Sequence, residues 1–294
     1  MKIYAIIVTY NGTKWIDKCF RSLLNSTVPL NILAIDNGST DGTPQLIRDN
    51  YSEVEVIETG QNLGFGKANN IGLKRVLEIK ADFAFLLNQD AWIEPNTIEK
   101  LINVSNKNVN IGILSPIHLN GKGNAIDYNF QHYLCNNNTV GFYSDLYLNS
   151  LKEHYTCKFA NAAGWLITDN CLRKIGGFDP MFIHYGEDDD YINRLHSAGL
   201  SICIVPEARI FHDRPQNGNM NEAYFKNQIY TNAILKAKSK KPPNKGFIIR
   251  KLVIDYIMLA IVYRGKNIDL KRSIKADCLY LKLKNKVSLK TYQP

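Results

Sequence analysis

Short apolar runs alternate with amphipathic segments along the first 110 residues of the chain. The apolar runs predict buried strands at residues 3–9, 30–36, 54–58 and 83–88. Apolar positions at helical spacing predict helices at residues 13–24, 43–50, 67–79 and 96–105. Because strands that alternate with helices favour right-handed βαβ crossovers, we expect an α/β fold with a mostly parallel sheet.

The second part of the chain is less regular. Residues 111–158 turn polar and aromatic, whereas residues 159–168 are nearly apolar. Beyond them we predict a helix at 187–198 and two short strands at 201–205 and 208–211. The segments from residue 221 onward are typical of helices, and Lys-Pro-Pro-Asn-Lys at 241–245 is the best linker candidate.

The net charge of +9 is unevenly distributed. Residues 236–294 contain 16 Lys and Arg against 3 Asp and Glu, while residues 1–235 contain 20 against 24. The basic segment leaves a non-enzymatic nucleic-acid-binding protein as an alternative, but the slightly acidic remainder argues against it. The apolar run at residues 3–8 is too short for a signal peptide, so we expect a cytoplasmic location.

Polar residues follow the predicted strands at the edge where α/β sheets bind their ligands. Asp36 ends the second strand, where it can accept hydrogen bonds from a ribose or a base, or cap the loop. A glycine-bearing loop at 60–66 opens a helix, where the backbone can approach a diphosphate. Asn69 stands where a dinucleotide fingerprint needs its third glycine, which disfavours the alternative of an NAD-dependent oxidoreductase.

Carboxylates occur at two further places. Asp90 closes the fourth strand, where it suits a hard divalent cation with few protein ligands, or caps the next turn. The run 187–190 consists of four consecutive carboxylates at a predicted helix N-terminus. The helix dipole tolerates acids there, but mutual repulsion can also raise one pKa enough to make a general base.

Read in order, these segments resemble the family 2 inverting glycosyltransferases, and more narrowly their bacterial rhamnosyltransferase-like branch. The motifs that carry the resemblance are IIVTYNG (6–12), IDNGSTDGT (35–43), NLGFGKANNIGL (62–73), LLNQDAWIEP (86–95), the segment 162–195 and IFHD (210–213). The resemblance extends from residue 3 to about residue 212. It implies the GT-A fold, in which a Rossmann-like nucleotide-binding sheet is joined to an acceptor region.

The resemblance also implies a role for each matching residue. Contacts with the nucleotide sugar fall to Thr9, Tyr10, Asn11, Asp36, Asn62, Gly64, Lys67, Asn88 and Gln89. Metal binding, to Mg²⁺ or Mn²⁺, falls to Asp90 and His212, catalysis to Asp188 as the base with Glu187 beside it, and acceptor binding to Trp165 and Asp190. The sequence departs from the family pattern at one position, because Asn88 replaces the first acid of the DxD motif.

By this resemblance the protein would be an inverting, metal-dependent glycosyltransferase. It would move a sugar from dTDP-rhamnose or a UDP-sugar to a hydroxyl of a bacterial surface glycan or lipid-linked glycan. UDP-galactose and UDP-N-acetylhexosamine are alternative donors on the same fold. The expected organisation is a GT-A domain at 1–220, with a nucleotide-sugar half at about 1–110 and an acceptor half at about 111–220, followed by a basic helical extension at 221–294.

The extension contains an apolar segment, residues 246–263, that Arg250, Lys251 and Asp255 interrupt. A spanning helix needs ~20 mostly apolar residues, so this segment should not cross a bilayer. With its flanking cations it predicts that residues 236–286 dock on an anionic membrane surface, at the inner face of the plasma membrane. The alternative is packing on the catalytic domain through Phe247, Ile248, Leu252, Ile254 and Met258.

Overall fold

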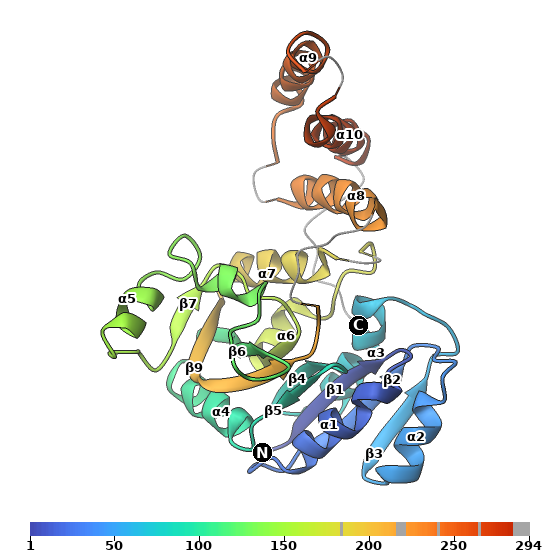
Figure 1. The fold of residues 1–294 in the computed structure, drawn as a ribbon, viewed down its shortest axis with the longest axis vertical. Coiled ribbons are helices and arrows are strands. Elements are labelled where there is room, and N and C mark those ends of the chain that lie inside the picture. Colours follow the sequence, from blue (N-terminus) through green and yellow to red (C-terminus); the bar gives the residue numbers. More distant parts are fainter. Residues whose placement is uncertain (183–184, 216–221, 240–241, 264–265, 285–294) are drawn as a thin grey trace.

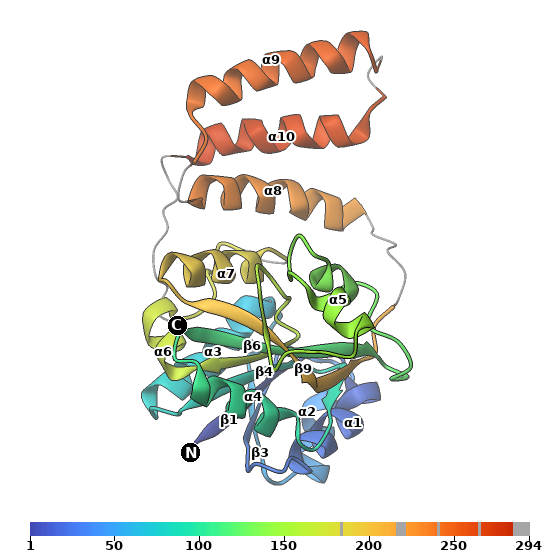
Figure 2. The same ribbon diagram turned by 90° about the vertical axis from the view of Figure 1, so that its left-hand side faces the viewer.

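The computed structural model describes residues 1–182, 185–215, 222–239, 242–263 and 266–284. Within them, nine strands form one sheet in the order β3-β2-β1-β4-β8-β6-β9-β5, with β7 paired to β9 (Figure 1). Helices cover the sheet, and three C-terminal helices are stacked beyond α7 (Figure 2). The α/β class expected from the sequence is confirmed.

The first half of the sheet consists of four parallel strands: β1 (Ile3–Thr9), β2 (Asn31–Asp36), β3 (Val54–Glu58) and β4 (Phe83–Asn88). The strand order changes direction at β1, which has β2 on one side and β4 on the other. Open α/β sheets bind ligands at such a switch point, beyond the carboxyl ends of the strands. Thr9, Asp36 and Asn88 end their strands at this place.

Two apolar cores sandwich these strands. The helices α1 (Thr13–Leu24), α2 (Thr43–Asn50) and α4 (Thr97–Lys107) contribute to one core, and α3 (Phe65–Glu78), α6 (Asp169–Ile175) and α7 (Glu187–Ser197) to the other. In α1 the buried residues Ile16, Cys19, Phe20 and Leu23 form a single stripe, since they recur every three or four positions. The strands are covered on both faces, which explains why they are continuous apolar runs in the sequence.

The second half of the sheet is mixed. β8 (Gly164–Thr168) runs antiparallel to both β4 and β6 (Ile111–Asn120), whereas β6 and β9 (Ser201–His212) are parallel. The short strands β5 (Ala91–Ile93) and β7 (Tyr155–Cys157) pair with β9, and the helices η1 (Phe130–Leu134) and α5 (Phe142–Tyr147) lie between β6 and β7 in the chain. The expected parallel arrangement therefore applies to the first four strands and to the β6–β9 pair.

Two strand predictions in this half were wrong. The region predicted to be irregular begins with β6, and the two short strands expected after residue 200 are the single strand β9. A proline interrupts each pattern, Pro116 in β6 and Pro206 in β9. The pairing of the two strands shifts register after Pro116, opposite the step from Val205 to Arg209. The irregularity accommodates prolines, which cannot donate to the ladder, inside a continuous strand.

Three C-terminal helices follow: α8 (Glu222–Lys238), α9 (Lys245–Ile261) and α10 (Ile268–Leu283). α10 lies between α8 and α9, so α9 is the outermost helix of the stack (Figure 2). A small core of their own joins them, made of Ala233, Ala237, Ile248, Leu252, Ile274 and Tyr280. The helices of the described ranges include none that is long and apolar enough to cross a membrane. The predicted linker at 241–245 lies partly outside the described residues, and Asn244 caps the start of α9.

Candidate active site

A buried hydrogen bond joins the carboxyl ends of β1 and β2. Thr9 Oγ1 donates to Asp36 Oδ1 at 2.9 Å, and Ser39 donates to the same carboxylate through its N–H at 2.9 Å and its hydroxyl at 2.6 Å. Thr9 is 0% and Asp36 1% exposed. The structure therefore does not support direct contact of these two side chains with the donor, because both are covered and hold neighbouring loops in place.

The loop after β1 carries Tyr10 and Asn11 at the surface. Gln89 holds Tyr10 by accepting from its N–H at 2.9 Å and donating to its carbonyl at 3.0 Å. Asn11 has a φ of 47°, a left-handed conformation that Asn tolerates, and its N–H donates to Ser39 Oγ at 2.9 Å. A Cβ at Gly12 would lie 2.2 Å from Gln89 Oε1, so a larger residue at Gly12 would displace this amide. Gln89 thus positions the exposed Tyr10, and its amide is not directed at a donor.

Two asparagines attach the glycine loop to the end of β2. Asn37 Nδ2 donates to Asn62 Oδ1 at 3.0 Å, and the same oxygen accepts from the Gly64 N–H at 2.9 Å. Gly64 precedes α3 with φ 84° and ψ 166°, a conformation that side chains disfavour. The free N–H groups that begin a helix favour a diphosphate, and Lys67 adds an exposed ammonium in the first turn of α3.

Strand pairing brings Asp90 and His212 together. β5 pairs with β9 so that Ala91 lies opposite His212, and the Asp213 N–H donates to the Asp90 carbonyl at 2.8 Å. His212 Nε2 lies 3.2 Å from Asp90 Oδ1 and 3.4 Å from Asn88 Nδ2. Side chains predicted from two separate motifs, Asn88 and Asp90 from one and His212 from the other, therefore meet at the end of β4.

This cluster offers the donor atoms that a divalent cation uses. Among the described atoms, Asn88 Oδ1 and His212 Nδ1 are buried without a hydrogen-bond partner. The described residues contain no group of three His, Cys, Asp or Glu side chains that could hold a metal by themselves. Asp90, His212 and the Asn88 amide oxygen therefore fit a cation that takes its remaining ligands from phosphate and water.

The four carboxylates begin α7, and the turn before it sets their position. Tyr185 and Gly186 both have positive φ, 66° and 89°, which for a bulky residue such as Tyr is a strain of about 1–3 kcal/mol. The Thr231 hydroxyl of α8 donates to the Tyr185 carbonyl at 3.0 Å. A Cβ at Gly186 would lie 2.2 Å from Thr231 Cγ2, so glycine is required beneath α8. The C-terminal extension therefore fixes the turn that presents the carboxylates.

A second glycine lets α7 approach the glycine loop. A Cβ added to Gly66 would lie 3.1 Å from Phe178 Cβ and 3.6 Å from Glu187 Cβ. Asn70 of α3 makes two hydrogen bonds with the Phe178 backbone, at 2.8 and 2.7 Å. The N-termini of α3 and α7 consequently adjoin, and the carboxylates lie beside the loop expected to meet the diphosphate.

Burial raises the pKa of Glu187 and of Asp188, and the charges of Glu187 and Asp189 raise the pKa of Asp188 further. Glu187 is buried, whereas Asp188 is partly exposed. Asp188 is thus both reachable and a stronger base than an ordinary aspartate. General-base catalysis near neutral pH needs this combination.

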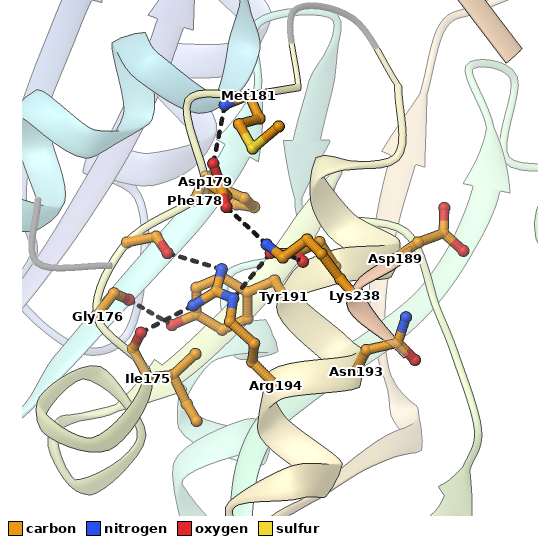
Figure 3. A network of polar contacts seen from close by, with 12 residues as sticks. Ile175, Gly176, Phe178, Asp179, Met181, Asp189, Tyr191, Asn193, Arg194 and Lys238 are labelled. Carbon is orange, nitrogen blue, oxygen red and sulfur yellow. Dashed lines mark hydrogen bonds and ion pairs between the residues drawn. The ribbon is translucent and has the colours of Figure 1, made fainter. Parts of the chain in front are cut away.

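Asp190, which we assigned to the acceptor, belongs to a buried ion-pair network with Arg194 and Lys238. Figure 3 shows these two partners together with Asp179. Asp190 is 1% exposed, and its oxygens lie 2.8 Å from Arg194 Nε and 2.5 Å from Lys238 Nζ. Lys238 also pairs with Asp179 at 2.6 Å, and Arg194 donates to the carbonyl of Ile175 at 2.8 Å. The acceptor assignment of Asp190 is therefore corrected: this carboxylate ties α7 to α8, and its partners Lys238 and Arg194 extend the network to the loop after α6.

Trp165, the other residue assigned to the acceptor, is also internal. Its side chain is 0% exposed and stacks on Phe178 with ring centroids 6.2 Å apart. The indole N–H donates to the Ala160 carbonyl at 3.2 Å. An acceptor cannot reach this ring, so Trp165 is a core residue that supports the Phe178 contact with α3.

Replacing Lys238 with Met should lower the free energy of unfolding by about 3–5 kcal/mol, because Asp179 and Asp190 would remain buried without their shared cation. Denaturant unfolding of the full chain measures this change. Lys238→Arg should restore part of the loss, and Lys282→Met, at an exposed cation of α10, is the matched control. Equal stability of Lys238→Met and the control would show that the network is not a structural link.

Three charged or polar residues near the site escaped the sequence analysis. Arg214 forms a bidentate ion pair with buried Asp127, with Nε 2.9 Å from Oδ2. Tyr133 of η1 lies within the electrostatic influence of Asp188 and Arg214, and burial raises its pKa. Lys238, the third of these residues, lies on α8 and pairs with Asp190 of α7. Only Arg214 had a signal in the sequence, since it closely follows His212.

The family model for Glycosyl transferase family 2 matches residues 4–164, and the model described as N-terminal domain of galactosyltransferase matches residues 151–215. The chain is 26% identical over 243 residues to the N-acetylglucosaminyl-diphospho-decaprenol L-rhamnosyltransferase of Mycobacterium tuberculosis, covering 74% of this chain and 78% of that protein. It is 26% identical over 215 residues to the dTDP-rhamnosyl transferase RfbF of Shigella flexneri, covering 71% of this chain and 68% of that protein.

Solved structures share the fold at low sequence identity. Staphylococcus aureus TarS 1–349 matches with a TM-score of 0.60 at 16% identity, over 96% of this chain and 80% of that one. GalNAc-T7 with UDP, GalNAc and Mn²⁺ matches with a TM-score of 0.58 at 16% identity, over 80% of this chain and 48% of that one. These likenesses confirm the GT-A fold, and the relatives confirm the likeness to rhamnosyltransferases. Since the family 2 model covers more than half of the chain, the protein belongs to glycosyltransferase family 2 and is a glycosyltransferase.

Proposed function

We propose that this glycosyltransferase moves a sugar, with inversion at its anomeric carbon, from a nucleoside-diphosphate donor to a hydroxyl of a bacterial surface glycan. The observation that carries the proposal is the meeting of α3 and α7, where Glu187, the neighbour of Asp188, packs on Gly66 of the helix that follows the glycine loop. The names of the two rhamnosyltransferase relatives support a dTDP-rhamnose donor and a lipid-linked acceptor. We also propose that the reaction takes place at the cytoplasmic face of a membrane, where a lipid-linked acceptor would lie.

In this mechanism Asp188 takes the proton of the acceptor hydroxyl as that oxygen attacks the anomeric carbon. The bond from the anomeric carbon to the diphosphate breaks on the opposite face, and the nucleoside diphosphate leaves. One carboxylate suffices, because a retaining enzyme alone needs a second as nucleophile. Burial raises the pKa of this base, and the negative charge of neighbouring Glu187 raises it further.

The proposal includes a divalent cation held by Asp90, His212 and Asn88 Oδ1. Mg²⁺ or Mn²⁺ at this place would neutralise the charge of the departing diphosphate. The unpartnered Asn88 oxygen and the close approach of Asp90 to His212 support this ligand set. Two structural neighbours were crystallised with Mn²⁺, GalNAc-T7 and the Pyrobaculum calidifontis mannosyltransferase PcManGT.

A donor screen tests the function. With Mn²⁺ and a lipid-linked N-acetylglucosamine acceptor, dTDP-rhamnose should release nucleoside diphosphate faster than UDP-galactose or UDP-N-acetylglucosamine. In parallel, dTDP with Mn²⁺ should raise the melting temperature of the protein more than either alone, because ligands that bind the native state stabilise it by mass action. Absence of stabilisation by every nucleoside diphosphate would reject nucleotide-sugar chemistry at this site.

A UDP-galactose donor is the second candidate. The galactosyltransferase-domain model matches residues 151–215, which include α7 and β9. In the same screen, release from UDP-galactose that exceeds release from dTDP-rhamnose would favour this donor and leave the roles of Asp188 and Asp90 unchanged.

A further inference from the structure

The helix α9 carries apolar side chains on its outer as well as its inner face, unlike an ordinary surface helix. Its acidic residue, Asp255, faces inward and pairs with Lys251 at 2.5 Å, and Lys251 also pairs with Asp277 of α10 at 2.9 Å. The opposite face carries six large side chains that are more than half exposed: Phe247, Val253, Ile254, Tyr256, Ile257 and Ile261. Contiguous apolar surface of this kind marks an interaction site.

The position of α9 shows that the catalytic domain does not cover this face. α10 separates α9 from α8, and α9 forms the far end of the molecule (Figures 1 and 2). Ile248 and Leu252, which the alternative to docking placed against the catalytic domain, are buried in the small core shared with α8 and α10. The other residues named in that alternative, Phe247, Ile254 and Met258, are exposed, so the packing alternative is wrong for them.

The charges beside this face are positive, which bears on the kind of partner that could cover it. Lys245 begins α9 and Arg250 lies among the apolar residues, and both are exposed, whereas the acid of the helix is paired inward. A second copy of the chain would bring these cations opposite one another, because a two-fold interface pairs a patch with itself. An anionic lipid surface offers both the apolar environment and the negative charge.

We propose that the outer face of α9 docks on an anionic membrane surface, with the helix lying in the headgroup plane. Its apolar side chains enter the acyl boundary, Tyr256 sits at the interface, and Lys245 and Arg250 meet lipid phosphates. The inference rests on the proposed function in one respect: docking would bring Asp188 to a lipid-linked acceptor. Of the segment first expected to dock, residues 240–241, 264–265 and 285–286 lie outside the described ranges.

Co-sedimentation of the full chain with vesicles tests this surface. Binding is expected to phosphatidylcholine vesicles that contain phosphatidylglycerol, to fall with added salt, and to be weak with phosphatidylcholine alone. Ile257→Glu should lower the partition coefficient at least tenfold, because it puts a charge in place of an apolar side chain that would enter the acyl boundary on docking. Val109→Glu, at a site 80% exposed outside the extension, is the matched control and should bind as the parent does.

Arg250→Gln should lower the partition coefficient about fivefold, the factor for ~1 kcal/mol per basic residue near an anionic surface, while Lys74→Gln on α3 should not change it. No binding to anionic vesicles at low salt would overturn the proposal. So would a dimer in sedimentation equilibrium that Ile257→Glu dissociates while vesicle binding stays absent. Neither result bears on nucleoside-diphosphate release, so failure of docking and failure of the proposed function are separable.

Discussion

Asp188→Asn is expected to reduce sugar transfer by ~10²–10⁴-fold while donor binding persists, because the amide cannot accept the proton of the acceptor hydroxyl. The substitution keeps the shape of a partly exposed side chain in the first turn of α7, so the fold should be retained. Turnover by nucleoside-diphosphate release and donor affinity by calorimetry measure the two quantities separately. Near-parental turnover would remove Asp188 from the role of base.

Asp189→Asn is the matched control, since Asp189 is the next residue of α7 and undergoes the same change. Its turnover should stay within a few-fold of the parent. Asp190→Asn differs from both: it weakens the pairs with Arg194 and Lys238, so its main effect should be on stability. These three neighbouring variants separate loss of the base from loss of charge and from loss of structure.

The dependence of turnover on pH tests the role of Asp188 independently. Burial and neighbouring acids raise the pKa of Asp188, and a base acts only when deprotonated, so turnover should rise with pH through the neutral range. Asp189→Asn removes one of the charges that raise this pKa, so the rise should move to lower pH. Asp188→Asn should abolish the rise. A profile that does not move in Asp189→Asn would contradict the assignment.

The nucleotide half of the fold could be predicted because its signals are local. The strands β3 and β4 and the helix α2 have the bounds expected from apolar runs and helical spacing. The strands β6 and β9 could not be delimited in this way, because prolines that normally end strands lie within them. β5 pairs with residues of β9 that lie 117 to 121 positions away in the chain, from Ile93 with Ile210 to Ala91 with His212, and such a pairing leaves no periodic signal.

In the site, too, the residue types could be predicted from the sequence, but their burial and partners could not. The sequence identified the acids of the site, but it could not separate Asp188 from Asp190, which differ by two positions on one helix. Burial beneath α8 makes Asp190 an ion-pair partner of Lys238, a residue 48 positions later. Likewise Gln89 stands in the DxD-like motif, yet its amide is occupied by the Tyr10 backbone. Assigning such roles requires knowing which polar atoms the fold already uses.

Asp90→Ala is expected to lower turnover by about 10²–10³-fold, since a cation bound there contributes several kcal/mol of charge stabilisation and each 1.4 kcal/mol is a factor of ten. Asp90 supplies the only carboxylate of the proposed ligand set. Stabilisation by nucleoside diphosphate with Mn²⁺, measured by thermal shift, should therefore be lost. Asp82→Ala is the control, because this acid precedes β4 at the opposite edge of the sheet and accepts from the Lys2 N–H.

Adding a carboxylate to the proposed cation site should have the opposite effect to Asp90→Ala. Asn88→Asp places a second carboxylate where an amide oxygen now has no partner among the described atoms, beside His212. Since carboxylate count tunes the affinity of hard cations, the variant should bind Mn²⁺ more tightly than the parent. Metal titration followed by thermal shift measures the change, with Asp90→Ala as the opposite extreme. If EDTA and both substitutions leave transfer unaltered, the diphosphate must be neutralised by the chain's own cations, and Lys67 at the start of α3 becomes the residue to substitute next.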